Sequence, residues 1–395
     1  MISNEEIEAA VKTITPDLVA LRRKLHQHPE LAFEEHVTAE IVADELKKTG
    51  LEVRTGIAGT GVVGLLDGAS AGRRIGVRAD MDALPITERT GLPFASEVAG
   101  KMHACGHDVH TVIVLGVARV LSAMRGKLSG GVKLIFQPAE ETLSGAAAMI
   151  EDGVLDNPAM DVILGFHNSP QMRTGLVGFH PVACMASSAA FDITLKGKGA
   201  HAAHPHTGID ALVGAAQLIT ALQTVISREI APAISAVVTI GQIEGGVARN
   251  VIAEQVTLRG TARTLDPGAA TQVETSVRRI AAGVCATLRL EHEITWKRQV
   301  PVLMNNASVL ASVVASARNV LGTEHVIDVG AASMGSEDFA WFAERVPAAH
   351  LRIGSKIDGL DTAIHRDNYA CNEDVIPIGV RVMTRAVLDL LAAKQ

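Results

Sequence analysis

The sequence predicts an α/β protein with two domains, in which a mostly parallel sheet is flanked by helices and a smaller α+β domain is inserted in the chain. Three observations lead to this prediction. The chain has 395 residues, more than one ordinary hydrophobic core accommodates. Its 36 glycines and many aliphatic residues are typical of a closely packed α/β protein with frequent turns. The third observation is the order of helical and strand patterns.

These patterns alternate in the first half of the chain. Apolar residues recur at helical spacing over 17–25, where Asp17 is the expected N-cap, and a second helix is expected over 37–48. Strands are predicted at 60–66, 74–78, 131–136 and 161–166, and helices at 108–121 and 144–152. The alternation indicates βα units and a mostly parallel sheet that helices cover on both faces.

The pattern changes near Met185. Strands are predicted at 191–196, 236–243, 255–262 and 291–296, with helices at 209–227 and 271–288. Their β-α-β-β-α-β order indicates a ferredoxin-like domain. We therefore expect an inserted domain at 187–298 between two parts of the main domain, 1–186 and 299–395. The second part resumes with a helix at 308–321.

Composition excludes several classes of protein. The net charge of -7 and the absence of a basic run argue against a nucleic-acid surface. Four scattered cysteines fit a reducing compartment, and the N-terminus lacks the pattern of a signal peptide. Apolar stretches such as 112–121 are shorter than the roughly 20 residues of a membrane-spanning helix. We expect a soluble cytoplasmic protein without a membrane partner.

Residues 103–110 (HACGHDVH) precede the predicted helix at 108–121 and contain two metal-ligand types. Gly106 permits a turn that lets Cys105 and His107 converge, and thiolate and imidazole both bind divalent metals well. Taken alone, this segment fits equally well a buried cysteine beside helix-capping polar groups.

Residues 137–141 (QPAEE) follow the predicted strand 131–136, where open α/β sheets place their ligands. If the segment is extended, the side chains of Glu140 and Glu141 diverge, so that one binds metal and the other faces substrate water. A solvated acidic loop is the alternative. His167, expected at the end of strand 161–166, and His365, in a turn-rich segment, are each compatible with a structural role.

The combination favours a metal centre more than its members do. Cysteine, glutamate and histidine at predicted strand ends, with a further histidine late in the chain, are the varied ligands of a catalytic site. Asp80 and Asp82 end another strand at the same edge. They are expected to orient the ligand histidines rather than bind metal, and Asp108 is assigned to the same supporting role.

In the inserted domain, His201 lies in a loop before a helix and Asn250 lies between two strands. Either side chain could stabilise a developing oxyanion or bind a substrate carboxylate. On local pattern alone, both are ordinary loop residues.

Taken in order, the motifs resemble the metallo-amidohydrolase and aminoacylase family that includes hippurate hydrolases, N-acyl-L-amino acid amidohydrolases, plant auxin-conjugate hydrolases and carboxypeptidase G. The resemblance spans nearly the whole chain. It rests on residues 22–31, 78–85, 103–108, 137–141, 199–201, 250–252 and 335–339, and on His365. Asp80 stands where many relatives have a metal-binding histidine, which places the chain in the Cys-Gly-His-Asp branch.

The resemblance implies a di-metal exopeptidase-like catalytic domain with two divalent ions per subunit, Zn²⁺ or Mn²⁺, with Co²⁺ or Ni²⁺ as alternatives. It assigns Cys105, His107, Glu141, His167 and His365 as ligands, with Cys105 bridging the ions. Glu140 is the implied general base. The implied reaction is hydrolysis of the amide of an N-acyl amino acid, hippurate-like or acetylated.

The family's inserted domain acts as lid and dimerisation module, so the resemblance also implies a homodimer or higher homo-oligomer. It gives His201, Asn250 and Arg263 contacts to the substrate carboxylate or the oxyanion, with His201 acting in its own subunit or in the partner. A dipeptidase or carboxypeptidase activity, and a binding module that has lost catalysis, are the alternatives.

Overall fold

The computed structural model describes residues 2–393, which form two compact units. The first unit consists of Met1–Cys184, Met304–Ala331 and Asp338–Gln395, and the second of Met185–Leu303 and Ala332–Glu337. The insertion expected at 187–298 therefore lies inside a second unit that also includes a short segment from much later in the chain.

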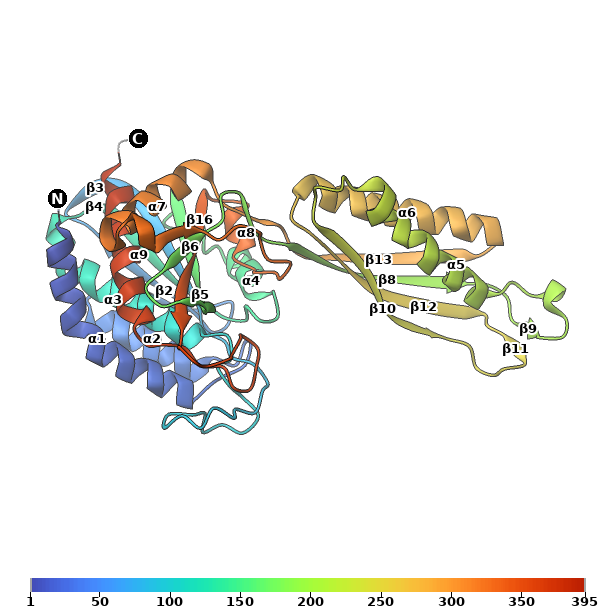
Figure 1. Cartoon of the computed structure of the whole chain (residues 1–395), viewed down its shortest axis with the longest axis horizontal. Helices are drawn as coiled ribbons and strands as arrows, with labels where there is room; N and C mark the ends of the chain where they lie inside the picture. The colour runs from blue at the N-terminus through green and yellow to red at the C-terminus, as the bar shows by residue number, and fades with distance from the viewer. Residues whose placement is uncertain (1, 394–395) are drawn as a thin grey trace. The chain divides into compact units, whose positions relative to one another are not determined.

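The first unit is built around an eight-stranded sheet (Figure 1), whose strand order is β1-β2-β4-β3-β5-β16-β6-β15. Its strands are β1 (Glu52–Ile57), β2 (Gly61–Asp67), β3 (Ser70–Asp80), β4 (Ser129–Gln137), β5 (Val162–Arg173), β6 (Val177–Phe179), β15 (Val326–Asp328) and β16 (Ala348–Lys356). The central strands β4, β3, β5 and β16 run parallel, while β1, β2 and β6 add antiparallel pairs. Almost every residue of β2 and β4 is buried, as expected for strands covered on both faces.

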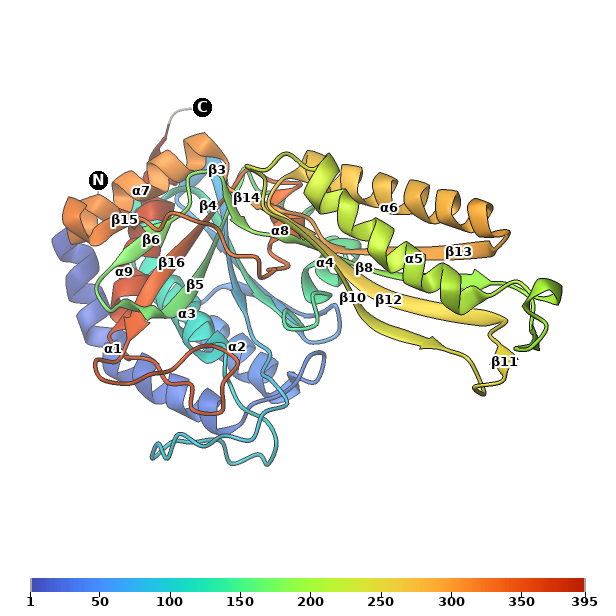
Figure 2. The ribbon, with the colours of Figure 1, turned by 45° about the vertical axis from the view of Figure 1, so that its right-hand side comes forward.

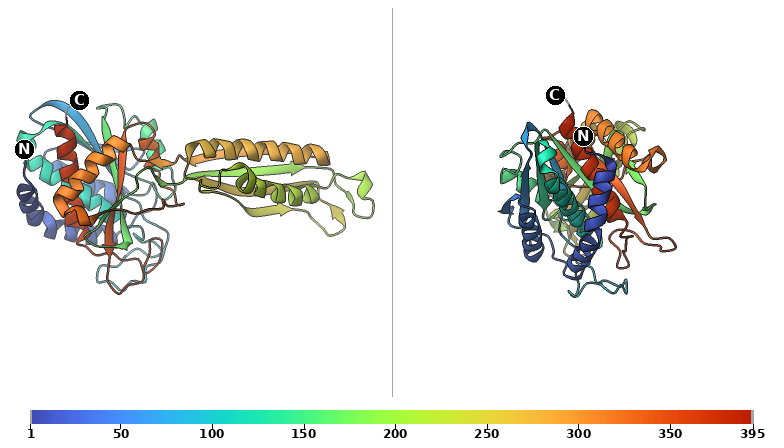
Figure 3. Two further views of the ribbon diagram at one scale, coloured as in Figure 1. Left: turned by 45° about the horizontal axis from the view of Figure 1, so that its top comes forward. Right: turned by 90° about the vertical axis from the view of Figure 1, so that its left-hand side faces the viewer.

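Helices flank this sheet. They are α1 (Asn4–Gln27), α2 (His36–Lys48), α3 (His107–Ala123), α4 (Gly145–Glu151), α7 (Ala307–Leu321), α8 (Ala340–Ala343) and α9 (Val375–Ala392). Helices α1, α3 and α9 contact one another (Figures 2 and 3), and α9 also packs against α7. Because α3 is apolar around nearly its whole circumference, it is buried on all sides. The predicted α/β architecture, a mostly parallel sheet flanked by helices, is confirmed.

The second unit contains a four-stranded antiparallel sheet of order β10-β12-β8-β13. Its elements are β8 (Ser187–Lys196), β9 (Ala200–His201), α5 (Ala211–Thr224), β10 (Ala236–Gly245), β11 (Val251–Ile252), β12 (Gln255–Thr264), α6 (Pro267–Leu288) and β13 (Glu291–Val300). Figure 1 shows α5 and α6 on one side of the sheet. A second hydrophobic core is formed by residues of these helices and of the sheet. The β-α-β-β-α-β order agrees with the ferredoxin-like prediction. The short strands β7 (Ala183–Met185) and β14 (Leu303–Met304) lie where the chain passes between the units.

One segment of the second unit has the length and hydropathy of a membrane span. It comprises α5 and the following helical turn, Ala211–Glu229. Ala211, Leu218 and Leu222 of this segment are buried in the core of the unit. The segment thus packs part of its surface against this core, and 33% of its apolar window is buried.

Two local predictions are wrong. The first helix begins at Asn4 rather than near Asp17, because Ser3 and Glu6 form a capping box and Pro16 is accommodated inside the helix. The strand expected at 161–166 continues to Arg173, because β16 pairs with its polar second half through Arg352 and Ile353. His167 therefore lies within β5 instead of ending it.

Candidate metal centre

The segments that carry the five predicted ligands converge in the first unit. Gly106 is the N-cap of α3 with a φ of 91°, and a Cβ at this position would lie 2.4 Å from Asn168 Oδ1. Glycine is therefore required at the turn that presents Cys105 and His107. His167 lies in β5, after Leu164, which is the last residue of this strand that pairs with β3.

The other two ligands come from irregular segments. Glu141 follows β4, in a turn that contains the left-handed residue Ala139 with a φ of 54°. His365 lies between β16 and α9, also has a positive φ, of 64°, and donates its backbone N–H to Ala104 O at 2.8 Å. This hydrogen bond places His365 beside the segment that carries Cys105.

The ligand atoms form overlapping groups. Cys105 Sγ lies 3.3 Å from His167 Nε2, and His365 Nε2 lies 3.2 Å from Glu141 Oε2. In the groups Cys105, His107, His167 and Cys105, Glu141, His365, all ligand atoms lie within 4.8 Å of one another. Cys105 belongs to both groups, so the structure brings together all five residues that the sequence singled out.

The donors fit divalent cations. His107 Nδ1 contacts the backbone oxygen of Asp82 at 2.9 Å, and His167 Nδ1 contacts the oxygen of Asn168 at 2.7 Å. With Nδ1 donating, each ring keeps the lone pair of Nε2 for a metal. His107 Nε2 and Glu141 Oε1 are buried and have no hydrogen-bond partner within residues 2–393. A bound cation would give both of these buried atoms a partner.

The charges around these donors also favour a cation. Burial, together with the carboxylates of Glu141 and Glu140, raises the pKa of the Cys105 thiol well above its usual value. Burial on its own would lower the pKa of His107, but the nearby Asp80 and the hydrogen bond to Asp82 raise it to about 10. The centre therefore has an excess of negative charge, which a metal ion would offset.

Asp80 and Asp82 support the ligands in different ways. Asp82 Oδ1 lies 3.2 Å from His107 Nδ1, while its Oδ2 accepts the backbone N–H of Glu141 at 2.9 Å. Asp80 accepts from Arg78 Nη1 and from His110 Nδ1, each at 2.6 Å, and its Oδ2 lies 3.6 Å from His107 Nε2. Asp82 thus contacts two predicted ligands directly.

Asp108 has a different environment from the one expected. Its Oδ2 lies 2.7 Å from Arg22 Nε and 2.8 Å from His26 Nδ1. Because these partners come from α1, the carboxylate fixes the start of α3 against α1 and does not contact a predicted metal ligand directly.

The two adjacent glutamates converge, which contradicts the predicted divergence. Glu140 Oε2 and Glu141 Oε1 each lie 3.9 Å from His107 Nε2. The reason is that the segment is a turn rather than an extended strand end, with Ala139 left-handed and Leu143 N bonded to Glu140 O at 2.7 Å. Glu140 is only 6% exposed, so its carboxylate is buried beside the ligands.

Several neighbours of the site were not singled out by the sequence. His110 Nε2 lies 2.8 Å from Asn168 Oδ1, and Asp338 accepts from Gln137 Nε2 at 2.7 Å and from Arg78 Nη2 at 3.0 Å. Asp338 belongs to the motif 335–339 that carried the family resemblance, and His110 ends the polar segment 103–110. The polar residues in these segments were the only sequence signal for such neighbours. They do not indicate which side chains form hydrogen bonds with one another.

His201, Asn250 and Arg263 lie in the second unit. His201 in β9 pairs with Val251 in β11, and Asn250 O accepts from Ala202 N at 3.0 Å, so His201 and Asn250 are near neighbours. Arg263 in β12 donates to Ser336 Oγ at 3.0 Å. The five predicted ligands all belong to the first unit.

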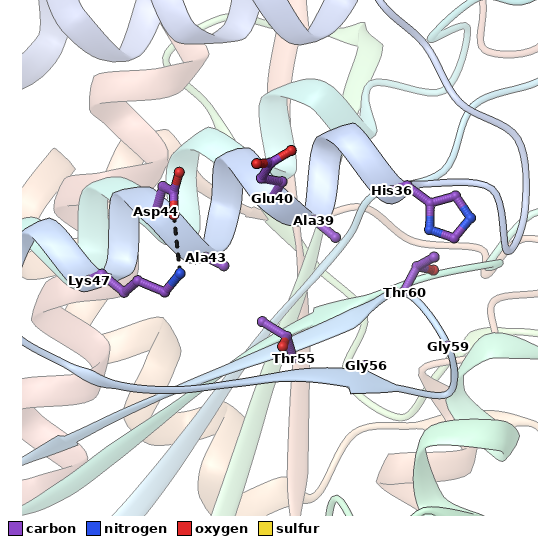
Figure 4. A pocket seen from close by; sticks show the side chains of 10 residues that line it. All are labelled: His36, Ala39, Glu40, Ala43, Asp44, Lys47, Thr55, Gly56, Gly59 and Thr60. Atoms are coloured by element: carbon purple, nitrogen blue, oxygen red, sulfur yellow. Dashed lines mark hydrogen bonds and ion pairs between the residues drawn. The ribbon is translucent and has the colours of Figure 1, made fainter.

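A cavity of about 390 Å³ lies elsewhere in the first unit, between α2 and the β1–β2 hairpin (Figure 4). Its lining comprises His36, Ala39, Glu40, Ala43, Asp44, Lys47, Thr55, Gly56, Gly59 and Thr60. Because no predicted site residue is among them, this cavity is separate from the candidate metal centre.

Known proteins match this chain closely. Peptidase family M20/M25/M40 matches residues 76–389. The N-acetyl-L-cysteine deacetylase of Bacillus subtilis is 40% identical over 375 residues, which cover 95% of this chain and 88% of that protein. The hippurate hydrolase of Campylobacter jejuni is 36% identical over 356 residues, which cover 90% of this chain and 92% of that protein.

A solved structure also resembles this chain over nearly its whole length. A Bacillus subtilis protein described as a dinuclear metal binding peptidase from the M20 family is 34% identical and superposes with a TM-score of 0.85. The superposition covers 97% of this chain and 100% of that chain. The family resemblance expected from the motifs is confirmed, and the chain belongs to Peptidase family M20/M25/M40.

Proposed function

We propose that this protein hydrolyses the amide bond of N-acyl amino acids, with two divalent metal ions and Glu140 as general base. The observation that carries this proposal is the convergence of five ligand side chains, of which Cys105, His107 and His167 are buried, with the further carboxylate of Glu140 beside them. The names of the deacetylase and hippurate hydrolase relatives support the amide of a single amino acid as the target.

The grouping of ligand atoms supports a division into two ion sites. Cys105, His107 and His167 would hold one ion, and Cys105, Glu141 and His365 the other, so that the sulfur is shared. When bound, the ions would polarise the scissile carbonyl and make an attacking water more acidic. Thiolate with imidazole favours Zn²⁺, while the carboxylate also suits Mn²⁺, Co²⁺ or Ni²⁺.

Glu140 is the group that moves the proton. Its neighbour Glu141 would be a metal ligand, so Glu140 is the carboxylate that would accept the proton of the attacking water. It then passes this proton to the leaving amine nitrogen, which departs as a free amino acid. Burial of Glu140 excludes competing bulk water from this transfer.

Residues of the second unit complete the proposal. His201 would stabilise the oxyanion, and Asn250 and Arg263 would bind the substrate carboxylate. We further propose a homodimer formed through this unit, in the cytoplasm. Strand β10 is an edge strand with exposed Val237 and Ile243, which supports a role in association.

Side-by-side kinetics on hippurate, N-acetyl amino acids and dipeptides test the proposal, with protein reconstituted in each metal. We expect turnover of the acylated amino acids and little turnover of dipeptides. Preference for dipeptides or longer peptides would identify a dipeptidase or carboxypeptidase instead. Metal-loaded protein that hydrolyses none of these amides would contradict catalysis and favour a binding module.

A further inference from the structure

Three buried carboxylates hold the segment 139–146, which comprises the turn that carries Glu140 and Glu141 and the start of α4. Glu35 Oε1 accepts from Ala139 N, Asp82 Oδ2 from Glu141 N, and Asp338 Oδ2 from Ala146 N, each at 2.9 Å. Backbone N–H groups of one short segment thus donate to three different carboxylates. Asp82 and Asp338 have other evident tasks, since Asp82 also contacts His107 and Asp338 pairs with Arg78.

Glu35 has no such second task in the metal centre. Its side chain is fully buried, and its oxygens accept from Thr60 Oγ1 at 2.6 Å and from Ala139 N. Within residues 2–393, no cation pairs with this carboxylate. Burial raises the pKa of Glu35, and the hydrogen bonds from Thr60 and Ala139 act against this shift. Burying a carboxylate without a cation costs folding free energy. This cost indicates that the two hydrogen bonds of Glu35 have a specific role.

The residue that Glu35 holds is under backbone strain. Ala139 is fully buried and left-handed, a conformation that a non-glycine residue adopts only when its surroundings impose it. This conformation starts the turn in which Glu140 and Glu141 both approach His107 Nε2. By accepting from Ala139 N, Glu35 therefore influences where the carboxylates of Glu140 and Glu141 point.

The position of Glu35 in the chain agrees with this task. It stands at the N-cap of α2, yet its side chain makes no capping hydrogen bond. Glu30 supplies those acceptors instead, to Val37 N at 3.0 Å and Thr38 N at 2.8 Å. Thr60, which also lines the cavity in Figure 4, fixes the second oxygen of Glu35. The Glu35 carboxylate therefore does not cap α2 and instead accepts from the turn at Ala139 N.

We propose that Glu35 is a positioning residue for catalysis, which holds Ala139 in its left-handed conformation and so directs Glu140 and Glu141 toward His107. The inference rests on the proposed function for the roles of those two glutamates. The geometry that it explains is independent of any substrate.

The test compares Glu35→Ala and Glu35→Gln with Glu30→Ala, a matched loss of a carboxylate that binds only the backbone of α2. In Glu35→Ala, we expect kcat to fall about 10- to 100-fold with a nearly unchanged KM. Glu35→Gln should recover much of this loss, because the side-chain oxygen can still accept from Ala139 N. Glu30→Ala should lower the melting temperature and leave kcat at the wild-type value.

Hydrogen exchange of the Ala139 amide in metal-free protein gives a readout that needs no turnover. We expect faster exchange in Glu35→Ala than in wild type or Glu30→Ala. Wild-type kcat and exchange in Glu35→Ala would overturn the inference, as would an equal loss of kcat in Glu30→Ala. If wild type hydrolyses no amide, the proposed function fails, while the exchange comparison still decides whether Glu35 holds the turn. If Glu35→Ala does not fold, Glu35→Gln gives a smaller version of the comparison, because an amide oxygen accepts more weakly from Ala139 N than a carboxylate does. Wild-type kcat together with wild-type exchange of the Ala139 amide in Glu35→Gln would then overturn the inference.

Discussion

Asp82 contacts His107 and orients its imidazole ring in the candidate metal centre. The backbone oxygen of Asp82 lies 2.9 Å from His107 Nδ1 and its Oδ1 lies 3.2 Å from the same nitrogen. Both acceptors select the tautomer that leaves Nε2 free for a metal. Since Oδ2 of the same carboxylate also binds Glu141 N, one side chain sets the geometry of a histidine and a carboxylate ligand.

Asp82→Ala is expected to weaken metal binding about 10- to 100-fold, because the His107 ring and the Glu141 backbone both lose an anchor. Titration of metal-stripped protein against a chelating indicator measures this change. The control is Asp44→Ala, which removes an exposed carboxylate whose partner is Lys47. Equal metal affinity in the two variants would contradict the orienting role of Asp82.

Local patterns predicted the ligand types of this centre and their places after predicted strands, and the family resemblance supplied the assignment of the five ligands. Cys105 and His107 flank a glycine whose φ is positive, and Glu140 and Glu141 follow an apolar strand, β4. Local patterns did not predict how the glutamates point, since that depends on the conformation of Ala139. Glu35 lies 104 residues away from its partner Ala139, so no local pattern reveals the hydrogen bond between them.

The start of α1 gives a second example. Pro16 and Asp17 look like the beginning of a helix, but the capping box of Ser3 and Glu6 begins it earlier. Proline costs less in this position than the packing of the longer helix provides, since Ile7 and Val11 join the core. Tertiary burial therefore overrides a local boundary signal. The role of Asp108 was misjudged for a similar reason, because its partners come from a distant helix.

The buried pair of Arg22 and Asp108 predicts a large effect on stability. Their side chains are 1% and 0% exposed, so Arg22→Met leaves a buried carboxylate without its main cation. We expect a loss of about 3–5 kcal/mol in the free energy of unfolding, measured by urea denaturation. Arg23→Met is the control, because Arg23 is 46% exposed and its pair with Glu373 is worth at most about 1 kcal/mol. Similar losses in both variants would argue against the buried pair as the cause.

His26 predicts a pH dependence of stability. Burial on its own would lower the pKa of His26, but Asp108 and a hydrogen bond to Glu88 raise it despite the nearby Arg22. Its contribution is fully present below about pH 6.5 and is lost as pH rises through the raised pKa. Between about pH 6 and pH 9, the free energy of unfolding should fall more in wild type than in His26→Gln. Parallel pH profiles for the two proteins would disprove this assignment.

Mixing inactive subunits tests whether His201 acts in the partner. If it does, a dimer of one His201→Ala chain and one Glu140→Gln chain has one complete site. Random exchange of subunits should then restore about a quarter of wild-type activity. The measurement is hydrolysis before and after the two variants are mixed and re-equilibrated. No recovery, with exchange of subunits verified, would assign His201 to the site of its own chain.

The central claim is that Glu140 moves the proton while its neighbour Glu141 binds metal. The most direct test measures the metal content and turnover of Glu140→Gln and Glu141→Gln side by side. We predict that Glu140→Gln keeps the wild-type metal content and loses about 10²- to 10⁴-fold in turnover, while Glu141→Gln loses metal as well. Wild-type turnover in Glu140→Gln, or a loss of metal equal to that of Glu141→Gln, would contradict the account.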